Sequence, residues 1–224
     1  ITKVEVRDGL KYLTAGDNEY VAKSVIIATG SEHKMLNIPG EEQFSGKGVS
    51  YCAVCDGAFF RNKEVIVIGG GDSAIEEALY LSNLVSKVTI IHRRDELRAQ
   101  KILRDRAFAK ENIHFIWDSI PLEIKGERKV SSVEIRNVKT GEENSVSTDG
   151  IFIYVGMLPQ TEDFKTLGIM NEAGYIPTNE KLETKVAGIF AAGDVREKEI
   201  RQVITAASDG AIAAQSAYNY VEGL

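Results

Sequence analysis

The sequence has few cysteines, no long apolar run and no excess of positive charge. Its 224 residues include only two cysteines, and no stretch approaches the roughly 18 apolar residues of a membrane-spanning helix. No signal segment opens the chain, so we expect a cytoplasmic protein with no membrane partner. The 27 basic residues against 33 acidic ones give a net charge of −6, which argues against nucleic acid as a partner. A hydrophobic content of 43% is sufficient for a buried core.

Both cysteines, Cys52 and Cys55, lie in one segment, CAVCDG. A disulfide between them would close a very small ring and stabilise the fold little, but it would be a good two-electron switch. Asp56 follows directly and is placed to carry protons for thiol chemistry. Half of a zinc site and a pair of unreactive thiols are the alternatives, but zinc needs four ligands and the histidines lack ligand spacing. We therefore expect catalytic sulfur chemistry at Cys52 and Cys55, and no bound metal.

A strand, a glycine-rich turn and a helix follow the cysteines. Residues 64–68 form an apolar strand, residues 69–74 read GGGDSA, and residues 75–84 have helical periodicity. In such a turn Gly69 permits a tight bend, Gly71 lets a pyrophosphate approach the backbone, and Ala74 lets the helix pack on the strand. The amides at the helix start attract phosphates. The pattern predicts a dinucleotide site that includes Gly69, Gly71, Asp72, Ser73 and Ala74.

Basic residues follow the next strand, at residues 88–91. A site for NAD would place Asp or Glu there to bind the ribose 2′-hydroxyl. The chain instead has His92, Arg93 and Arg94, with Arg98 one turn further on. Arginines form charge-assisted hydrogen bonds with a 2′-phosphate, so we expect NADPH as the cofactor. The alternative is a solvated helix start, although cations oppose the helix dipole at that end.

The remaining elements surround this unit on both sides. Alternation of apolar and polar residues predicts strands at 1–6 and 10–14, and a strand buried on both faces at 24–28. Further elements are expected at 101–110 (helix) and at 113–117, 130–138, 143–147 and 150–156 (strands). A last buried strand ends at Gly193 and Asp194, before a helix at about 201–221. The Asp194 carboxylate is well placed there to bind a sugar hydroxyl, and a helix cap is the alternative.

The chain resembles the low-molecular-weight thioredoxin reductases in the order and spacing of five segments. These are CAVCDG, GGGDSA, HRRDELRA, GIFAAGDV and RQVITAASDGAIAA. The reductases are flavoprotein pyridine nucleotide-disulfide oxidoreductases, and the resemblance covers essentially the whole chain. It implies an α/β fold with two dinucleotide-binding, Rossmann-like domains and β-meanders. It also implies that NADPH reduces FAD, that the flavin reduces the Cys52–Cys55 disulfide, and that the dithiol reduces thioredoxin. Cys52 would attack thioredoxin, Cys55 would face the flavin, and Asp56 would move protons.

The resemblance further assigns domains and flavin-binding residues. Residues 1–34 and 158–224 would form the FAD-binding domain, and residues 35–157 the domain for NADPH and the redox disulfide. The family also implies a homodimer. The expected flavin-binding residues are Thr29, Gly30, Gly193, Asp194, Arg201, Gln202 and Val203.

One feature of the family is missing from this sequence. No FAD fingerprint, a strand followed by G-x-G-x-x-G or G-x-G-x-x-A, precedes residue 65. We therefore expect an FAD domain that is incomplete at its N-terminus by roughly 80 to 90 residues. Two other functions stay open: a truncated nucleotide-binding fragment without turnover, and the flavoprotein reductase of a peroxiredoxin system. The second tends to prefer NADH, which the arginines argue against.

Overall fold

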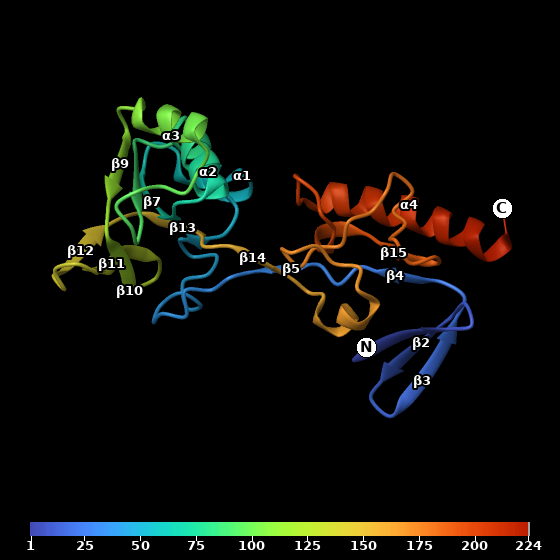
Figure 1. The fold of residues 1–224 in the computed structure, drawn as a ribbon. Helices are drawn as coiled ribbons and strands as arrows, with labels where there is room; N and C mark the ends of the chain where they lie inside the picture. Colours follow the sequence, from blue (N-terminus) through green and yellow to red (C-terminus); the bar gives the residue numbers. More distant parts are fainter. Residues whose placement is uncertain (224) are drawn as a thin grey trace. The chain divides into compact units, whose positions relative to one another are not determined.

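The computed structural model describes residues 1–223, which form two compact units (Figure 1). Unit 1 consists of Ile1–Glu32 and Met157–Leu224, and unit 2 consists of His33–Gly156. In the sequence, unit 2 is therefore inserted into unit 1. β5 (Ser31–His33) and β14 (Met157–Pro159) form a two-stranded sheet where the chain passes between the units.

The centre of unit 2 is a parallel sheet of five strands in the order β6-β13-β7-β8-β9. Each strand is short and largely apolar, as expected for strands covered on both faces. Parallel neighbours need long crossover connections, and these carry the helices of the unit. The strands are β6 (Val49–Ser50), β7 (Glu64–Gly69), β8 (Lys87–Ile91), β9 (Ile113–Ile116) and β13 (Gly150–Tyr154).

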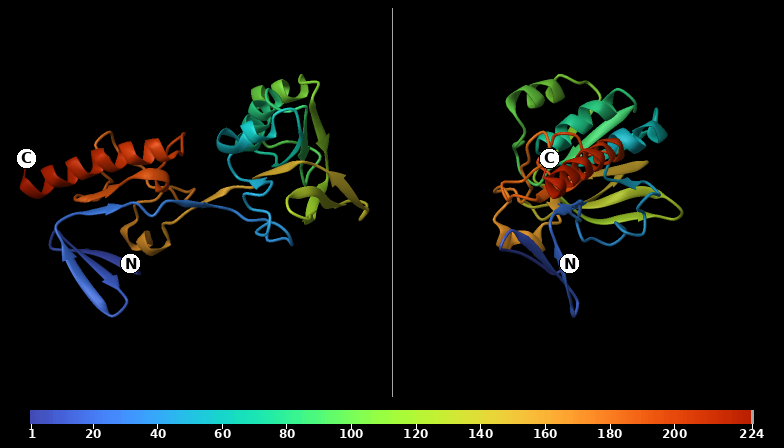
Figure 2. Two further views of the ribbon diagram at one scale, coloured as in Figure 1. Left: turned by 180° about the vertical axis from the view of Figure 1, so that it is seen from behind. Right: turned by 90° about the vertical axis from the view of Figure 1, so that its right-hand side faces the viewer.

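Two different layers cover the faces of this sheet (Figures 1 and 2). Val65 and Val67 of β7 pack in a core with α2 (Asp72–Ser82) and α3 (Lys101–Phe108). Ile66 and Ile68, which point to the opposite face, pack in a second core with an antiparallel sheet. That sheet consists of β10 (Ser119–Gly126), β11 (Val130–Asn137) and β12 (Glu143–Ser147).

Unit 1 contains an antiparallel meander, a parallel strand pair and a long helix. The meander is β1 (Lys3–Arg7), β2 (Leu10–Ala15) and β3 (Asn18–Ala22). β4 (Val25–Ile27) pairs in parallel with β15 (Ile189–Ala191), and α4 (Val203–Glu222) runs along this pair in both figures. Phe190 and Ala192 pack against Ala213 and Ala217 of α4. The 3-10 turns η2 (Glu162–Leu167) and η3 (Gly193–Val195) complete the unit.

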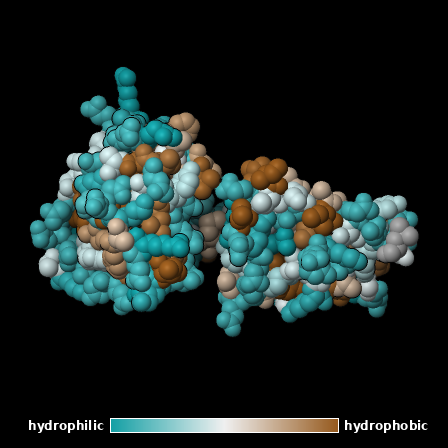
Figure 3. All heavy atoms as spheres, turned by 90° about the horizontal axis from the view of Figure 1, so that it is seen from above, coloured by the Kyte–Doolittle hydropathy of each residue, from teal (hydrophilic) through white to brown (hydrophobic). Residues whose placement is uncertain are grey.

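The structure differs from the element predictions in two ways. β3, β10 and the short strands β5, β6 and β14 were not expected, and residues 24–28 are not buried on both faces, because Ile26 is 39% exposed. Ile27, the next residue along β4, is 2% exposed and packs in a core with Val4 and Phe164, so this face of the strand is the better covered one. Apolar side chains also reach the surface elsewhere, as Figure 3 shows. None of the helices within residues 1–223 has the length and apolar character needed to cross a membrane.

Candidate active site

Cys52 and Cys55 are joined by a disulfide, with their Cα atoms 5.3 Å apart. Cys52 is the N-cap of α1 (Ala53–Asp56), a helix of one turn, and α1 leads into η1 (Gly57–Phe60). The Cys55 amide donates a hydrogen bond to Cys52 Sγ at 3.2 Å. An amide donor stabilises negative charge on sulfur, so after reduction this contact favours a thiolate at Cys52.

Asp56 is held close to the cysteines by Ser50. The Ser50 hydroxyl donates to Asp56 Oδ2 at 2.7 Å, and the Cys52 amide donates to Ser50 Oγ at 3.1 Å. The serine thereby orients the carboxylate that the sequence assigns to proton transfer. Sequence reasoning did not identify Ser50, because a single serine on a two-residue strand carries no pattern.

Tyr154 is a second residue that sequence reasoning did not assign to the site. Its hydroxyl accepts a hydrogen bond from the Ala53 amide at 2.7 Å. Burial, and then the charges of Glu77 and Asp56, raise the pKa of Tyr154, partly offset by the Ala53 hydrogen bond. The side chain is therefore a neutral phenol that braces the first residue of α1.

The glycine turn has the geometry of a dinucleotide-binding turn. Gly69 has φ +151°, and a Cβ there would lie 2.5 Å from the Tyr154 carbonyl oxygen and 2.8 Å from Ala74 Cβ. Only glycine fits this close approach of strand and helix. A Cβ at Gly71 would meet nothing within 4 Å, so open space lies beside the start of α2. The Asp72 carboxylate accepts hydrogen bonds from the Gln100 amide and side chain at 2.7 and 3.2 Å, and so anchors the following loop.

A pocket of about 530 Å³ lies at the ends of β7, β8 and β13. Arg98 is one of the residues that line this pocket. Its backbone amide donates to the Gly70 carbonyl at 2.7 Å, which fixes the loop after β8 to the glycine turn. The structure does not bring Arg94 into the lining; its side chain is exposed. Of the predicted nucleotide-binding residues, the lining includes Gly69, His92, Arg93 and Arg98.

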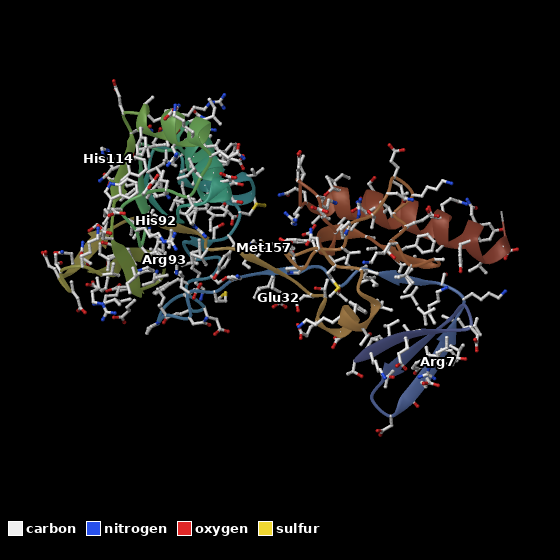
Figure 4. All side chains as sticks on the ribbon, in the orientation of Figure 1. Arg7, Glu32, His92, Arg93, His114 and Met157 are labelled. Carbon is white, nitrogen blue, oxygen red and sulfur yellow. A yellow bond between two sulfur atoms is a disulfide. The ribbon has the colours of Figure 1, made fainter. Side chains whose placement is uncertain are left out.

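His92 is the buried member of the basic cluster, at 5% exposure. Burial lowers the pKa of His92, and the nearby arginines add to this, so the imidazole is neutral around pH 7. Its ring stacks so closely on the turn that a Cβ at Gly70 would lie 2.4 Å from it. Within residues 1–223 its Nε2 is buried without a hydrogen-bond partner. Figure 4 shows His92 next to Arg93, whereas His114 lies apart on β9.

In unit 1, two predicted groups of flavin-binding residues follow adjacent parallel strands. β4 and β15 run in parallel with Ile27 opposite Ala191, so Thr29 and Gly30 leave the same edge as Gly193 and Asp194. Ligands of open α/β sheets bind at this carboxyl edge. The Thr29 hydroxyl donates to the Gln160 carbonyl at 2.5 Å, which makes its side chain part of the local framework.

Asp194 and Arg201 each keep a buried polar atom without a partner in the described residues, Oδ1 and Nε respectively. The Arg201 guanidinium lies over the Tyr175 ring, 4.3 Å from its centroid. Gln202 is the N-cap of α4 and forms a capping box with Thr205, and Val203 is 87% exposed at the first helical position. Two unpaired buried polar atoms and an exposed helix start are consistent with a ligand site here.

Comparisons with known proteins agree with this geometry. Residues 2–210 match the pyridine nucleotide-disulphide oxidoreductase family. The thioredoxin reductase of Bacillus subtilis (strain 168) is 57% identical over 223 residues, which cover 98% of this chain and 71% of that protein. That of Treponema pallidum (strain Nichols) is 50% identical over 229 residues, covering 100% and 73%.

Solved structures give the same result. The thioredoxin reductase from Streptococcus pyogenes MGAS5005 superposes with a TM-score of 0.94 at 53% identity, over 100% of this chain and 73% of that one. That from Giardia duodenalis gives 0.93 at 37% identity, over 99% and 74%. These neighbours confirm the predicted α/β fold with two dinucleotide-binding domains, and they favour a thioredoxin reductase over the alternatives. The chain belongs to the thioredoxin reductases of the pyridine nucleotide-disulphide oxidoreductase family.

Proposed function

We propose that this chain transfers electrons from NADPH through FAD to the Cys52–Cys55 disulfide and from there to thioredoxin. In this proposal unit 2, close to residues 35–157, carries NADPH and the disulfide. Unit 1, close to residues 1–34 and 158–224, contributes to the FAD site. The observation that carries the proposal is the closed disulfide at Cys52 and Cys55, in the same unit as a glycine turn and an arginine-lined pocket.

The pocket of unit 2 fits a 2′-phosphorylated pyridine nucleotide. Arg93 and Arg98 at its wall supply the charges that a 2′-phosphate needs, and the unpaired Nε2 of neutral His92 can accept or donate one hydrogen bond. The open space beside Gly71 admits a pyrophosphate at the start of α2. We propose Ser73 and Asp72 as further members, Ser73 through its place in the first turn and Asp72 through its hold on Gln100.

The carboxyl edge of β4 and β15 fits a flavin nucleotide. Asp194 Oδ1 is a buried acceptor without a partner in the described chain, as a ribityl hydroxyl requires, and Arg201 Nε is an unpaired donor. Gln202 and Val203 stand at the start of α4, whose dipole favours negative charge. A bound flavin would supply the two-electron relay between nicotinamide and disulfide.

The chain's own residues then perform thiol–disulfide exchange. Reduction of the disulfide consumes two electrons and one proton and leaves one thiol and one thiolate. The Cys52 thiolate attacks a sulfur of the thioredoxin disulfide, which forms a mixed disulfide and releases the other thioredoxin sulfur as a thiolate. Asp56, oriented by Ser50, accepts the proton of the Cys55 thiol and passes it to the first released thioredoxin thiolate. The resulting Cys55 thiolate attacks Cys52 Sγ, which restores the internal disulfide and releases the second thioredoxin thiolate, and that thiolate takes a proton from solvent.

The test is the absorbance spectrum of the complete protein before and after NADPH, with a Cys55→Ser variant in parallel. We expect NADPH to bleach the flavin in both proteins, and thioredoxin reduction to fall by at least about 10³-fold in the variant, because the second exchange step is lost. An unbleached wild-type flavin, or thioredoxin reduction that persists in the variant, would contradict the proposal.

The nucleotide preference is tested separately with Arg93→Ala and Arg98→Ala. Each charge-assisted hydrogen bond to a 2′-phosphate contributes about 1.5–3 kcal/mol, so we expect kcat/KM for NADPH to fall by about 10- to 100-fold per substitution. The value for NADH, which lacks the phosphate, should change by less than about 3-fold. Arg94→Ala, whose side chain lies outside the pocket lining, is the matched control. Equal losses with both nucleotides would remove the arginines from 2′-phosphate recognition.

The family resemblance also supports a homodimer. Sedimentation of the complete protein at micromolar concentration tests this, with twice the chain mass expected and a monomer contradicting it.

A further inference from the structure

Tyr154 contacts the nucleotide turn through its backbone. It is the last residue of β13 and pairs in register with Gly69 of β7. A Cβ at Gly69 would lie 2.5 Å from the Tyr154 carbonyl oxygen, so the two backbones are in tight contact. The residue also lines the pocket together with Gly70 and His92. A ligand in that pocket therefore meets Tyr154 directly.

The other end of Tyr154 contacts the redox helix. Its hydroxyl accepts the Ala53 amide at 2.7 Å, and Ala53 is fully buried and follows Cys52 directly. Phe152, two residues earlier on β13, belongs to the same core as Ala53 and Ala78 of α2. Tyr154 thus connects the glycine turn, which its backbone contacts, with the first turn of α1, which its hydroxyl contacts.

The hydrogen bond to Ala53 is well suited to transmit a shift. Burial and the charges of Glu77 and Asp56 raise the pKa of Tyr154, so its hydroxyl is a neutral phenol whose oxygen accepts the Ala53 amide. Reduction of the disulfide moves the two sulfur atoms from bonding distance to van der Waals separation. Cys52 is the N-cap of α1, so its movement acts on the Ala53 amide and hence on Tyr154.

We propose that Tyr154 is a positioning residue that couples occupancy of the nucleotide pocket to the redox state of Cys52 and Cys55. The inference rests on the proposed function, because it takes the pocket to be the nucleotide site. The coupling is reciprocal: if the nucleotide binds one redox state more tightly, it shifts the disulfide potential by the same free energy. For this two-electron couple, a tenfold difference in Kd corresponds to about 30 mV.

The test measures binding of 2′-phospho-ADP-ribose to the complete protein in its disulfide and dithiol forms. This probe lacks nicotinamide and cannot transfer hydride. We expect the two Kd values to differ by about 5-fold or more in the wild type, and by less than 2-fold in Tyr154→Phe. The variant keeps the backbone and the ring of residue 154 and removes only the hydroxyl, so the two Kd values are compared within each protein and only their ratio is interpreted. A wild-type ratio of one, or a ratio unchanged in the variant, would overturn the inference.

Two controls make the result specific. Tyr51→Phe removes the hydroxyl of the residue that precedes Cys52, but that hydroxyl bonds to Glu41 at 2.9 Å and to Met35 Sδ at 3.1 Å and not to α1, so the wild-type ratio should persist. Loss of the ratio in this control would count against Tyr154. The double variant Cys52→Ser, Cys55→Ser cannot form the disulfide. Its Kd for the probe should therefore be the same with and without reductant, which controls for direct effects of the reductant.

A measurement on the wild type decides the question even if Tyr154→Phe does not fold. Amide hydrogen exchange at Ala53 in the disulfide form should slow by at least about 3-fold when the probe binds, and unchanged exchange would overturn the coupling. Absence of probe binding to the wild type would contradict the proposed nucleotide site. Binding without a Kd difference would contradict the coupling alone.

Discussion

Unit 2 buries its sheet between two apolar layers, whereas unit 1 combines a two-stranded parallel pair with buried charges. In unit 2, alternate residues of β7 pack in two separate cores, and five strands are hydrogen-bonded in one sheet. In unit 1, β4 and β15 are one pair, and Ile26 remains partly exposed. The same strand-and-helix elements are therefore stabilised in different ways.

Two buried charged side chains of unit 1, Lys11 and Asp209, have several polar partners each. Lys11 is 0% exposed, and its ammonium donates to the carbonyls of Gly9 and Lys23 at 3.0 and 2.9 Å. Asp209 of α4 is 7% exposed and binds Arg196 and Lys198 at 2.9 and 2.8 Å. The comparison teaches that the sheet of unit 2 is stabilised by apolar area on both faces, while unit 1 also contains buried charges whose partners are costly to remove.

The largest expected effect follows from Asp209→Ala in unit 1. The substitution leaves two largely buried cations, Arg196 and Lys198, without their carboxylate and removes the acceptor of the Gly193 amide, which donates to Asp209 at 3.0 Å. Loss of one partner of a buried ion pair costs about 3–5 kcal/mol. The loss in the free energy of unfolding of unit 1 is measured by hydrogen exchange of the α4 amides at increasing urea concentration. Glu162→Ala, which breaks an exposed pair with Lys165, is the control and should cost less than about 1 kcal/mol. A cost below that value at Asp209 would contradict the account of unit 1.

Phe152→Ala in unit 2 is expected to lower the free energy of unfolding by a similar amount, because it creates a cavity in the core. Phe152 is fully buried and packs edge-to-face on Phe60 at 5.3 Å between ring centroids. A cavity of this kind costs about 3–5 kcal/mol. Because no charge is involved, the loss should be the same in 0.05 and about 1 M salt, whereas that of Asp209→Ala should change. Equal salt dependence of the two variants would break the comparison.

The smallest expected effect is the difference between the units in acid. The pKa of His92 is lowered in the folded protein, first by burial. The stability that unit 2 gains from neutral His92 is therefore complete above pH ~6.5 and is lost as pH falls toward the pKa of His92 in the folded state. Burial raises the pKa of Asp209, but hydrogen bonds from Lys198 and Arg196 lower it overall, so unit 1 loses stability only below pH ~4.

Hydrogen exchange between pH 7.5 and 3.5 should therefore show β8 weakening before α4. Titration of a single group changes the free energy of unfolding by at most about 1.4 kcal/mol per pH unit. His92→Asn should remove the slope near pH 6, and His114→Asn, at an exposed position, should not. A slope that survives in His92→Asn would assign it to another group.

The sequence predicted four of the five parallel strands of unit 2, all except β6, because continuous apolar runs such as residues 64–68 leave few other structures open. It missed β10, where Pro121 and an irregular register beside it weaken the strand pattern, and β3, which is almost entirely exposed. The burial of residues 24–28 was overestimated because an apolar segment does not show how completely other elements cover each of its two faces.

The site shows the same division between local and tertiary information. Gly69, His92, Arg93 and Arg98 lie around one pocket, as a motif of fixed spacing predicts. The parts played by Ser50 and Tyr154 arise from contacts with Asp56 and Ala53. Tyr154 and Ala53 are distant in sequence, and no single-sequence pattern encodes their contact.

The central claim is that nucleotide electrons reach the two sulfurs of α1. The direct measurement is alkylation of thiols in the complete protein, held without oxygen, before and after one equivalent of NADPH, with mass spectrometry of the segment containing Cys52 and Cys55. The account predicts no alkylation beforehand and two alkyl groups afterwards. A flavin that is reduced, and a thioredoxin that is turned over, while Cys52 and Cys55 stay joined would contradict it.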